Sequence, residues 1–153
     1  MRLLKSSLLF AVILMFTLGL SAQSTEDSIA IKKTALDYIE GYFYKDGKRM
    51  EKALHPELVK RNIQKSKNGT EYIRNLSASY MIMRAENNTN RHAANPEEPI
   101  ESVVEIYDIV GNAATVKVST NQYNFIDYLH MGKYNNEWKI INVFWTILPK
   151  NDK

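Results

Sequence analysis

Asp127 is the carboxylate best placed for acid–base chemistry in this sequence of 153 residues. It alternates with Phe125 and Leu129, so a strand at this point would turn all three side chains to one face. Burial among apolar neighbours disfavours the charged form of a carboxyl group and makes it a usable proton carrier. The alternative is an Asp near a strand end that is solvated or bonded to a backbone amide. Both interpretations stay open on the sequence.

His55 is the second candidate base, because it lies between Leu54 and Pro56, at a corner where helices would meet strands. A histidine in such a place also commonly fixes a loop by bonding to a backbone carbonyl. His130 alternates with aromatic and aliphatic residues and is expected to be structural. His92 lies in a polar stretch and has no claim to chemistry.

Two tyrosines lie on the apolar stripe of the first predicted helix. Tyr38 and Tyr42 are one helical turn apart, so both can point into an interior, where their hydroxyls need partners. Asp127, Asn142 or a ligand could be that partner. Core packing with the hydroxyls at the rim is the alternative.

Two further aromatic residues, Tyr107 and Trp145, could stack on a flat heterocycle, although aromatic residues on long strands usually belong to the core. The predicted ligand-binding residues are therefore Tyr38, Tyr42, His55, Tyr107, Asp127, Asn142 and Trp145. The sequence does not decide whether any of them is catalytic. Three scattered His and no Cys give none of the usual metal-ligand patterns, so we expect neither a metal nor a cofactor.

The elements that must position these residues change in type along the chain. The expected order is a helix from Ser24 or Thr25 to Asp46-Gly47, a short helix from Lys48 to Leu54, a strand from Thr70 to Leu76 and a helix from Ser77 to about Glu86. The stretch from Asn87 to Pro99 is polar and contains proline, and it is expected to be an exposed, mobile loop.

Two hairpins are expected after Ile100. The first joins Glu101–Ile109 to Ala113–Thr120 through Gly111-Asn112, and a two-residue loop would place Tyr107 opposite Val116, on the apolar face.

The second hairpin turns at Asn135-Asn136. Its expected pairs are Met131 with Ile140, Leu129 with Asn142 and Asp127 with Phe144. The other face would then carry a patch suited to pairing with a second copy, made of Tyr128, His130, Val143 and Trp145. A slip of one residue would swap the two faces.

The N-terminus has the pattern of an export signal. Arg2 and Lys5 precede an apolar run of about a dozen residues, which is short for a membrane span, and cleavage is expected after Ala22 or Ser21. An uncleaved anchor is the alternative. Residues 1–22 are therefore expected to be a signal peptide, and residues 23–153 one domain in a periplasmic or secreted protein. No stable membrane anchor is expected after cleavage.

Removal of this leader makes the chain nearly neutral. The 20 Lys and Arg include Arg2 and Lys5, which leaves 18 basic residues against 17 acidic ones, so a nucleic-acid partner is not expected. The local cluster of Lys60, Arg61, Lys65 and Lys67 is expected to lie in a solvated loop. Without cysteine, the stability of an exported chain must come from its core.

The order of these elements resembles the nuclear-transport-factor-2-like superfamily, and within it the small bacterial domains described as putative lumazine-binding proteins. The matching stretches are Tyr38 to Tyr42, Asp46 to Met50, Ala53 to Arg61, Asp127 to Met131 and Trp138 to Val143. The resemblance covers about Glu26 to Leu148. It implies an α+β cone in which a curved antiparallel sheet packs against about three N-terminal helices. The stretch between Lys60 and the third helix is shorter than the family pattern.

Three hypotheses on function follow. The first is an exported, non-catalytic domain that binds a small flat or apolar molecule in an aromatic-lined pocket. The second is an enzyme similar to ketosteroid isomerase or a polyketide cyclase, with Asp127 or His55 as base and Tyr38 or Tyr42 as oxyanion donor. The third is an interaction module that forms a homodimer through the sheet.

Overall fold

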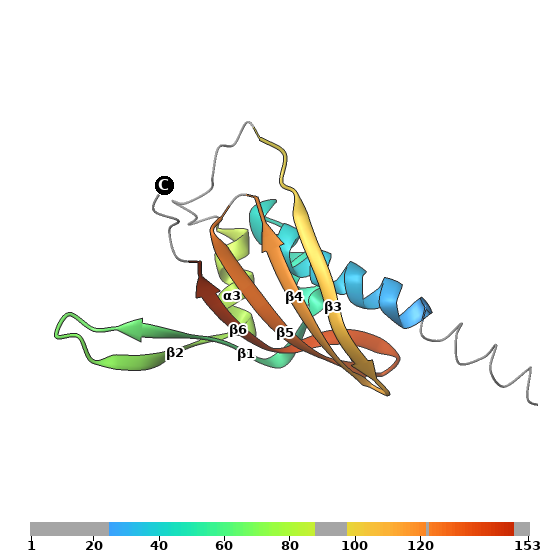
Figure 1. The fold of residues 1–153 in the computed structure, drawn as a ribbon. Helices are drawn as coiled ribbons and strands as arrows, with labels where there is room; N and C mark the ends of the chain where they lie inside the picture. Colours follow the sequence, from blue (N-terminus) through green and yellow to red (C-terminus); the bar gives the residue numbers. More distant parts are fainter. Residues whose placement is uncertain (1–24, 88–97, 122, 149–153) are drawn as a thin grey trace, which may run out of the picture.

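The computed structural model describes residues 25–87, 98–121 and 123–148. A helix covers residues 25–43, and the other elements follow in the order α2 (Gly47–Ala53), β1 (Leu54–Lys65), β2 (Glu71–Ser77), α3 (Ala78–Glu86), β3 (Ser102–Val110), β4 (Ala113–Thr120), β5 (Phe125–Tyr134) and β6 (Glu137–Ile147) (Figure 1). The predicted signal peptide and nearly all of the predicted loop from Asn87 to Pro99 lie outside the described residues. None of the described helices is long and apolar enough to cross a membrane.

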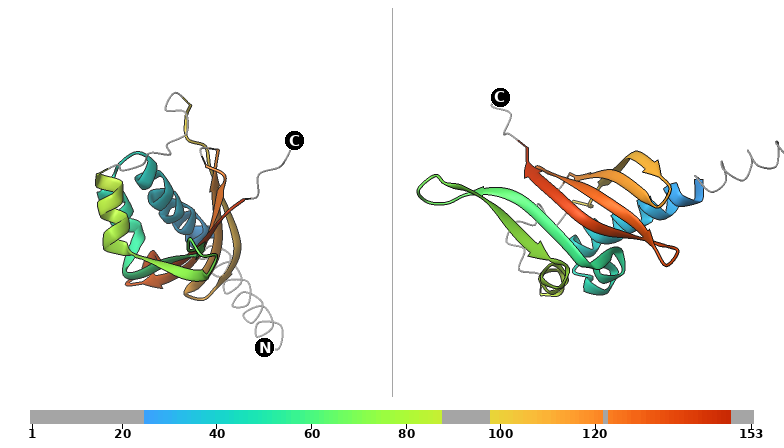
Figure 2. Two further views of the ribbon diagram at one scale, coloured as in Figure 1. Left: turned by 90° about the vertical axis from the view of Figure 1, so that its left-hand side faces the viewer. Right: turned by 90° about the horizontal axis from the view of Figure 1, so that it is seen from below.

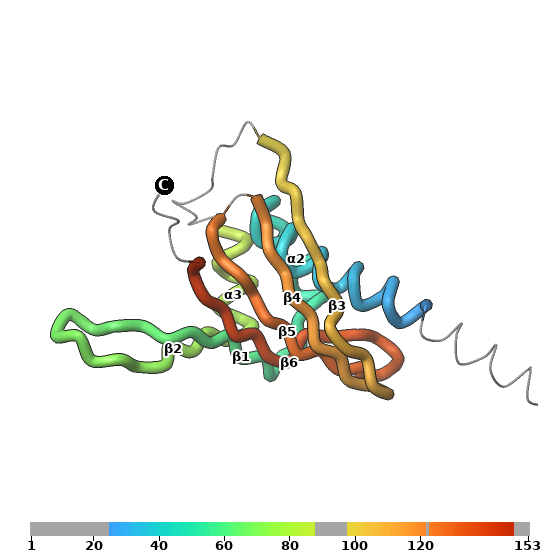
Figure 3. The backbone as a smooth tube through the Cα atoms, in the orientation of Figure 1, coloured from blue at the N-terminus to red at the C-terminus, as the bar shows by residue number. Residues whose placement is uncertain are grey.

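All six strands belong to one curved sheet in the order β2-β1-β6-β5-β4-β3, in which only β1 and β6 run parallel. The helices gather on one face of this sheet, as Figure 2 shows in two views. The β1–β2 hairpin extends beyond the other strands (Figure 3). This is the predicted α+β cone, with the sheet left open at β2 and β3.

The core lies between the helix of residues 25–43 and the inner face of the sheet. The predicted apolar stripe of that helix is confirmed, because Ile31, Ala35, Tyr38 and Ile39 are all buried. The predicted third helix is confirmed together with its cap, since the Ser77 side chain accepts a hydrogen bond from the backbone N–H of Tyr80.

A β-bulge in β3 overturns the predicted register of the first hairpin. Val110 pairs with Ala113 across the expected two-residue loop, but Ile106, not Tyr107, pairs with Val116. The extra residue at Tyr107 turns its ring to the outer face, where its exposed fraction is 54%. The prediction that Tyr107 lies on the inner, apolar face was therefore wrong.

A second irregularity changes the register of the β5–β6 hairpin. Met131 pairs with Ile140 as predicted. The register then shifts between His130 and Met131, so that Leu129 pairs with Val143 and Asp127 pairs with Trp145. The predicted pairs of Leu129 with Asn142 and of Asp127 with Phe144 were wrong.

The shift also changes which residues of β6 face the interior. It turns Val143 and Trp145 inward and moves Asn142 to the other face, where it pairs with His130. The predicted pairing patch therefore loses Val143, which is fully buried, and Trp145.

Candidate functional site

A buried cluster of one aspartate, one tyrosine and one lysine lies between the first helix and the sheet. The Tyr38 hydroxyl donates to Oδ2 of Asp127 at 2.6 Å. The Lys60 ammonium donates to the Tyr38 oxygen at 2.7 Å and to the two carboxylate oxygens of Asp127 at 3.0 and 2.8 Å. Asp127 is fully buried, and Lys60 is only 8% exposed. The interpretation of Asp127 as a solvated residue was therefore wrong.

Each member of this cluster comes from a different element. Tyr38 lies on the buried stripe of the first helix, and Asp127 alternates with Phe125 and Leu129 on the inner face of β5, as predicted. Lys60 lies on the inner face of β1, between the buried residues Leu58 and Asn62. The prediction that Lys60 is a solvated loop residue was wrong, because a buried carboxylate needs a cation and Lys60 supplies it.

The contacts of this cluster are mutually satisfied. Three donor hydrogens on Lys60 match the three oxygens around it, and both oxygens of Asp127 accept from Lys60. Burial, and then the charge of Asp127, raise the pKa of the Tyr38 hydroxyl well above its ordinary value of 10.0, so this hydroxyl is protonated at neutral pH. The arrangement orients these side chains, and it leaves no oxygen of Asp127 without a hydrogen bond.

Aromatic rings surround the ammonium of Lys60 on its other sides. Its nitrogen lies 5.3 Å from the ring centre of Trp145 and 5.7 Å from that of Phe125. Phe125 contacts Trp145 edge to face, and Tyr123 lies against Phe125 and stacks on Phe43 of the first helix. We call Phe43, Tyr123, Phe125 and Trp145 the aromatic cluster.

Three buried polar atoms near these rings have no hydrogen-bond partner among the described residues. They are Oδ1 of Asn62, the hydroxyl of Tyr123 and Nε1 of Trp145. Asn62 follows Lys60 by two positions on the same face of β1 and is 4% exposed. An unpartnered buried polar atom costs about 1–3 kcal/mol. Three of them in one region are unusual for a region that serves packing alone.

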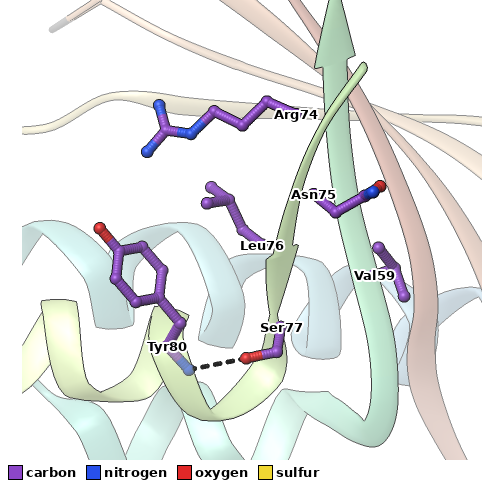
Figure 4. A pocket seen from close by; sticks show the side chains of 6 residues that line it. All are labelled: Val59, Arg74, Asn75, Leu76, Ser77 and Tyr80. Atoms are coloured by element: carbon purple, nitrogen blue, oxygen red, sulfur yellow. Dashed lines mark hydrogen bonds between the residues drawn. The ribbon is translucent and has the colours of Figure 1, made fainter. Parts of the chain in front are cut away.

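A surface hollow of about 480 Å³ lies beside the edge strand β2 and α3. It is lined by Val59, Arg74, Asn75, Leu76, Ser77 and Tyr80. Figure 4 shows that Arg74, Leu76 and Tyr80 extend to one side of β2, whereas Asn75 points to the other. Arg74 pairs with Asn62 and Leu76 pairs with Lys60 across the β1–β2 ladder, so these four side chains share the inner face.

The other predicted site residues are distributed over the molecule. Tyr42 is half-buried and contacts Phe43 edge to face, which places it beside the aromatic cluster. The Nδ1 atom of His55 accepts from the backbone N–H of Glu57, and its ring contacts Tyr134 near the β5–β6 turn. His55 thus fixes its local backbone, through an amide and not the predicted carbonyl.

Asn142 contacts Arg61 and His130 on the outer face. The prediction of Asn142 as a partner for a tyrosine hydroxyl was therefore wrong. In sum, the structure brings Tyr38, Asp127 and Trp145 together, has Tyr42 close by, and places His55, Tyr107 and Asn142 elsewhere.

Sequence reasoning missed the polar residues of β1, β2 and α3 in this region. At a spacing of two, Lys60 and Asn62 have only Leu58 as an apolar neighbour, so alternation does not mark this face of β1 as buried. The signal that could have found Lys60 is chemical, because a carboxylate predicted to be buried requires a cationic partner.

A family model described as putative lumazine-binding matches residues 26–146. The chain belongs to this family. Its fold is that of the nuclear-transport-factor-2-like superfamily, as the resemblance implied. No curated protein matches the chain.

Solved structures with the same fold include an NTF2-like protein of unknown function from Shewanella baltica, which is 18% identical, with a TM-score of 0.65 over 82% of this chain and 97% of that one. A second such protein, from Silicibacter pomeroyi, is 16% identical with a TM-score of 0.63 over 82% and 98%. A ketosteroid isomerase-like protein from Erwinia carotovora atroseptica is 7% identical, with a TM-score of 0.54 over 79% and 95%. At these identities, the likeness shows the fold alone.

Proposed function

We propose that this chain is an exported, non-catalytic domain that binds a small flat heterocycle between α3 and the aromatic cluster. The observation that carries the proposal is the set of buried atoms on Asn62, Tyr123 and Trp145 that find no hydrogen-bond partner in the described part of the chain. A ligand that enters from the hollow beside β2 would supply the missing hydrogen bonds.

The three atoms differ in what they offer a ligand. Oδ1 of Asn62 accepts, Nε1 of Trp145 donates, and the hydroxyl of Tyr123 does both. A heterocycle whose edge alternates donors and acceptors, such as a pteridine, complements this set. The rings of the aromatic cluster provide faces on which such a ligand stacks. The description of the family as putative lumazine-binding supports the same ligand class.

The contacts of the candidate bases favour binding over catalysis. Asp127 is fully buried and both of its oxygens accept from Lys60, whereas a general base must lie within hydrogen-bond reach of the substrate proton. The other candidate base, His55, contacts Tyr134 near the β5–β6 turn. We therefore prefer the binding function to the isomerase-like alternative.

The proposal is tested by thermal unfolding of the purified protein with lumazine, riboflavin and a steroid. We expect lumazine or riboflavin to stabilise the protein, by about 2.7 kcal/mol at a hundredfold excess over its Kd. Tyr123→Phe removes one unpartnered hydroxyl and should weaken that binding about tenfold, whereas Tyr72→Phe, on the exposed β2 edge, should not. Stabilisation by no member of the panel would contradict the proposed function.

A further inference from the structure

Two arginines from different elements converge on one tyrosine hydroxyl in the hollow beside β2. Nη1 of Arg84, on α3, donates to the Tyr80 hydroxyl at 3.4 Å, and the Arg84 guanidinium carbon lies 5.9 Å from the centre of the Tyr80 ring. Arg74, on β2, extends into the same space (Figure 4). The hydrogen bond from Arg84 lowers the pKa of the Tyr80 hydroxyl, and the charges of Arg84 and Arg74 lower it further.

Neither guanidinium is neutralised within the described part of the chain. Among the described residues, neither Arg74 nor Arg84 forms an ion pair with Asp or Glu. The cations that do are Lys33, Arg49, Lys60, Lys65, Lys117, Lys133 and Lys139. Both arginines are only half-exposed. Two positive charges that both act on the Tyr80 hydroxyl, partly shielded from water and without a carboxylate partner among the described residues, form a site that favours an anion.

The position of this pair relates it to the proposed heterocycle site. Arg74 pairs directly with Asn62, whose Oδ1 is one of the unpartnered atoms, and directly opposite residues of an antiparallel ladder are about 5 Å apart. Leu76, which pairs with Lys60, lines the hollow together with Arg74. One molecule the size of a substituted pteridine can therefore reach both the aromatic cluster and the arginines.

We propose that the ligand of this domain carries an acidic group, a carboxylate or a phosphate, which Arg74 and Arg84 bind together with the Tyr80 hydroxyl. This inference rests on the proposed function, since it extends the same ligand toward the hollow. Guanidinium groups match both oxyanions through paired N–H donors, and the Tyr80 hydroxyl adds a third donor.

Matched pairs of probes test the inference. Pterin-6-carboxylate is compared with pterin, and riboflavin 5′-phosphate with riboflavin, by calorimetric titration of the mature protein. We expect the acidic member of at least one pair to bind at least tenfold more tightly, and the pair that shows the difference identifies the carboxylate or the phosphate. Arg74→Gln and Arg84→Gln should each reduce this difference in affinity about tenfold and leave the affinity for the neutral probe unchanged. Lys67→Gln, an exposed change of equal charge on the same hairpin, should leave the advantage intact.

Equal affinity for both members of each pair, or an advantage that survives both arginine variants, would overturn the inference. An independent measurement separates it from the proposed function: the side-chain Nε–Hε signals of Arg74 and Arg84 are followed by NMR during titration with inorganic phosphate and with acetate. Shifts confined to these two arginines support the anion site even if no heterocycle binds. Their absence overturns the anion site even if lumazine binds.

Discussion

At the scale of single residues, two buried tyrosine hydroxyls in one region have opposite surroundings. The hydroxyl of Tyr38 contacts Asp127 and Lys60, whereas that of Tyr123 has no partner among the described residues. Removing the Tyr38 hydroxyl breaks hydrogen bonds to Asp127 and Lys60. Removing the Tyr123 hydroxyl removes a buried polar group that has no hydrogen bond to lose among the described residues. The same substitution should therefore have opposite effects at the two positions.

Tyr38→Phe should lower the free energy of unfolding by about 1–3 kcal/mol, because Lys60 and Asp127 each lose a buried hydrogen bond. Chemical denaturation of the ligand-free protein measures the change. A free energy of unfolding equal to that of the wild type would contradict the closed network described here.

Tyr123→Phe should leave the ligand-free protein as stable as the wild type, or raise its free energy of unfolding by up to about 1 kcal/mol, since the lost hydroxyl is buried without a partner among the described residues. The same denaturation experiment, run beside Tyr38→Phe, provides the comparison. A loss of stability as large as that of Tyr38→Phe would show that the Tyr123 hydroxyl has a partner in the folded protein.

Sequence reasoning found two of the three residues in the buried cluster, and the reason is periodicity. Tyr38 lies on a helical stripe and Asp127 on a strand of period two, so their neighbours indicate which way they point. Lys60 has only Leu58 as such a neighbour, and its position depends on the pairing of β1 with β6, which is a contact distant in sequence.

At the scale of elements, the first helix is fixed to the sheet near its start by one carboxylate. Asp27 accepts from Nζ of Lys133 at 2.8 Å and from Nε1 of Trp138 at 2.9 Å. These hydrogen bonds, that of Lys133 foremost, lower the pKa of Asp27 below its ordinary value of 3.8. In the unfolded chain Asp27 takes up a proton at a higher pH, so acid favours unfolding.

Asp27 should thus contribute its full stabilisation above about pH 4 and lose it as the pH falls through the lowered pKa. Asp27→Asn should lower the free energy of unfolding by about 1–2 kcal/mol at pH 7 and make it less sensitive to acid. Denaturation of both proteins between pH 7 and pH 3 checks this. A constant difference over that whole range would contradict the role given to the carboxylate.

Bulges explain why the elements were predicted better than their faces. The strands of the two C-terminal hairpins and their turns follow from alternation and from Gly111-Asn112 and Asn135-Asn136, but one extra residue in a strand reverses every side chain beyond it. That reversal moved Tyr107 outward and Trp145 inward. Alternation alone carries no signal for where such a residue is inserted.

At the scale of the whole molecule, the export signal stays a prediction. Full-length protein expressed in a bacterial host should lose residues 1–22 and appear outside the cytoplasm, which intact mass and fractionation would show. Leu14→Arg interrupts the apolar run and should keep the protein uncleaved. A wild-type protein that retains its first 22 residues would contradict the prediction.

Homodimer formation through the sheet also stays a prediction, now without Val143 and Trp145 in its patch.

The two tryptophans of the chain allow NMR to show whether a ligand binds at the aromatic cluster. Nε1 of Trp138 is bonded to Asp27, whereas Nε1 of Trp145 has no partner among the described residues, so their indole N–H signals in an NMR spectrum report on one bonded and one unbonded donor. On addition of lumazine we predict a large shift of the Trp145 signal and almost none of the Trp138 signal. Equal shifts of both signals, or no shift of either, would contradict a ligand site at the aromatic cluster.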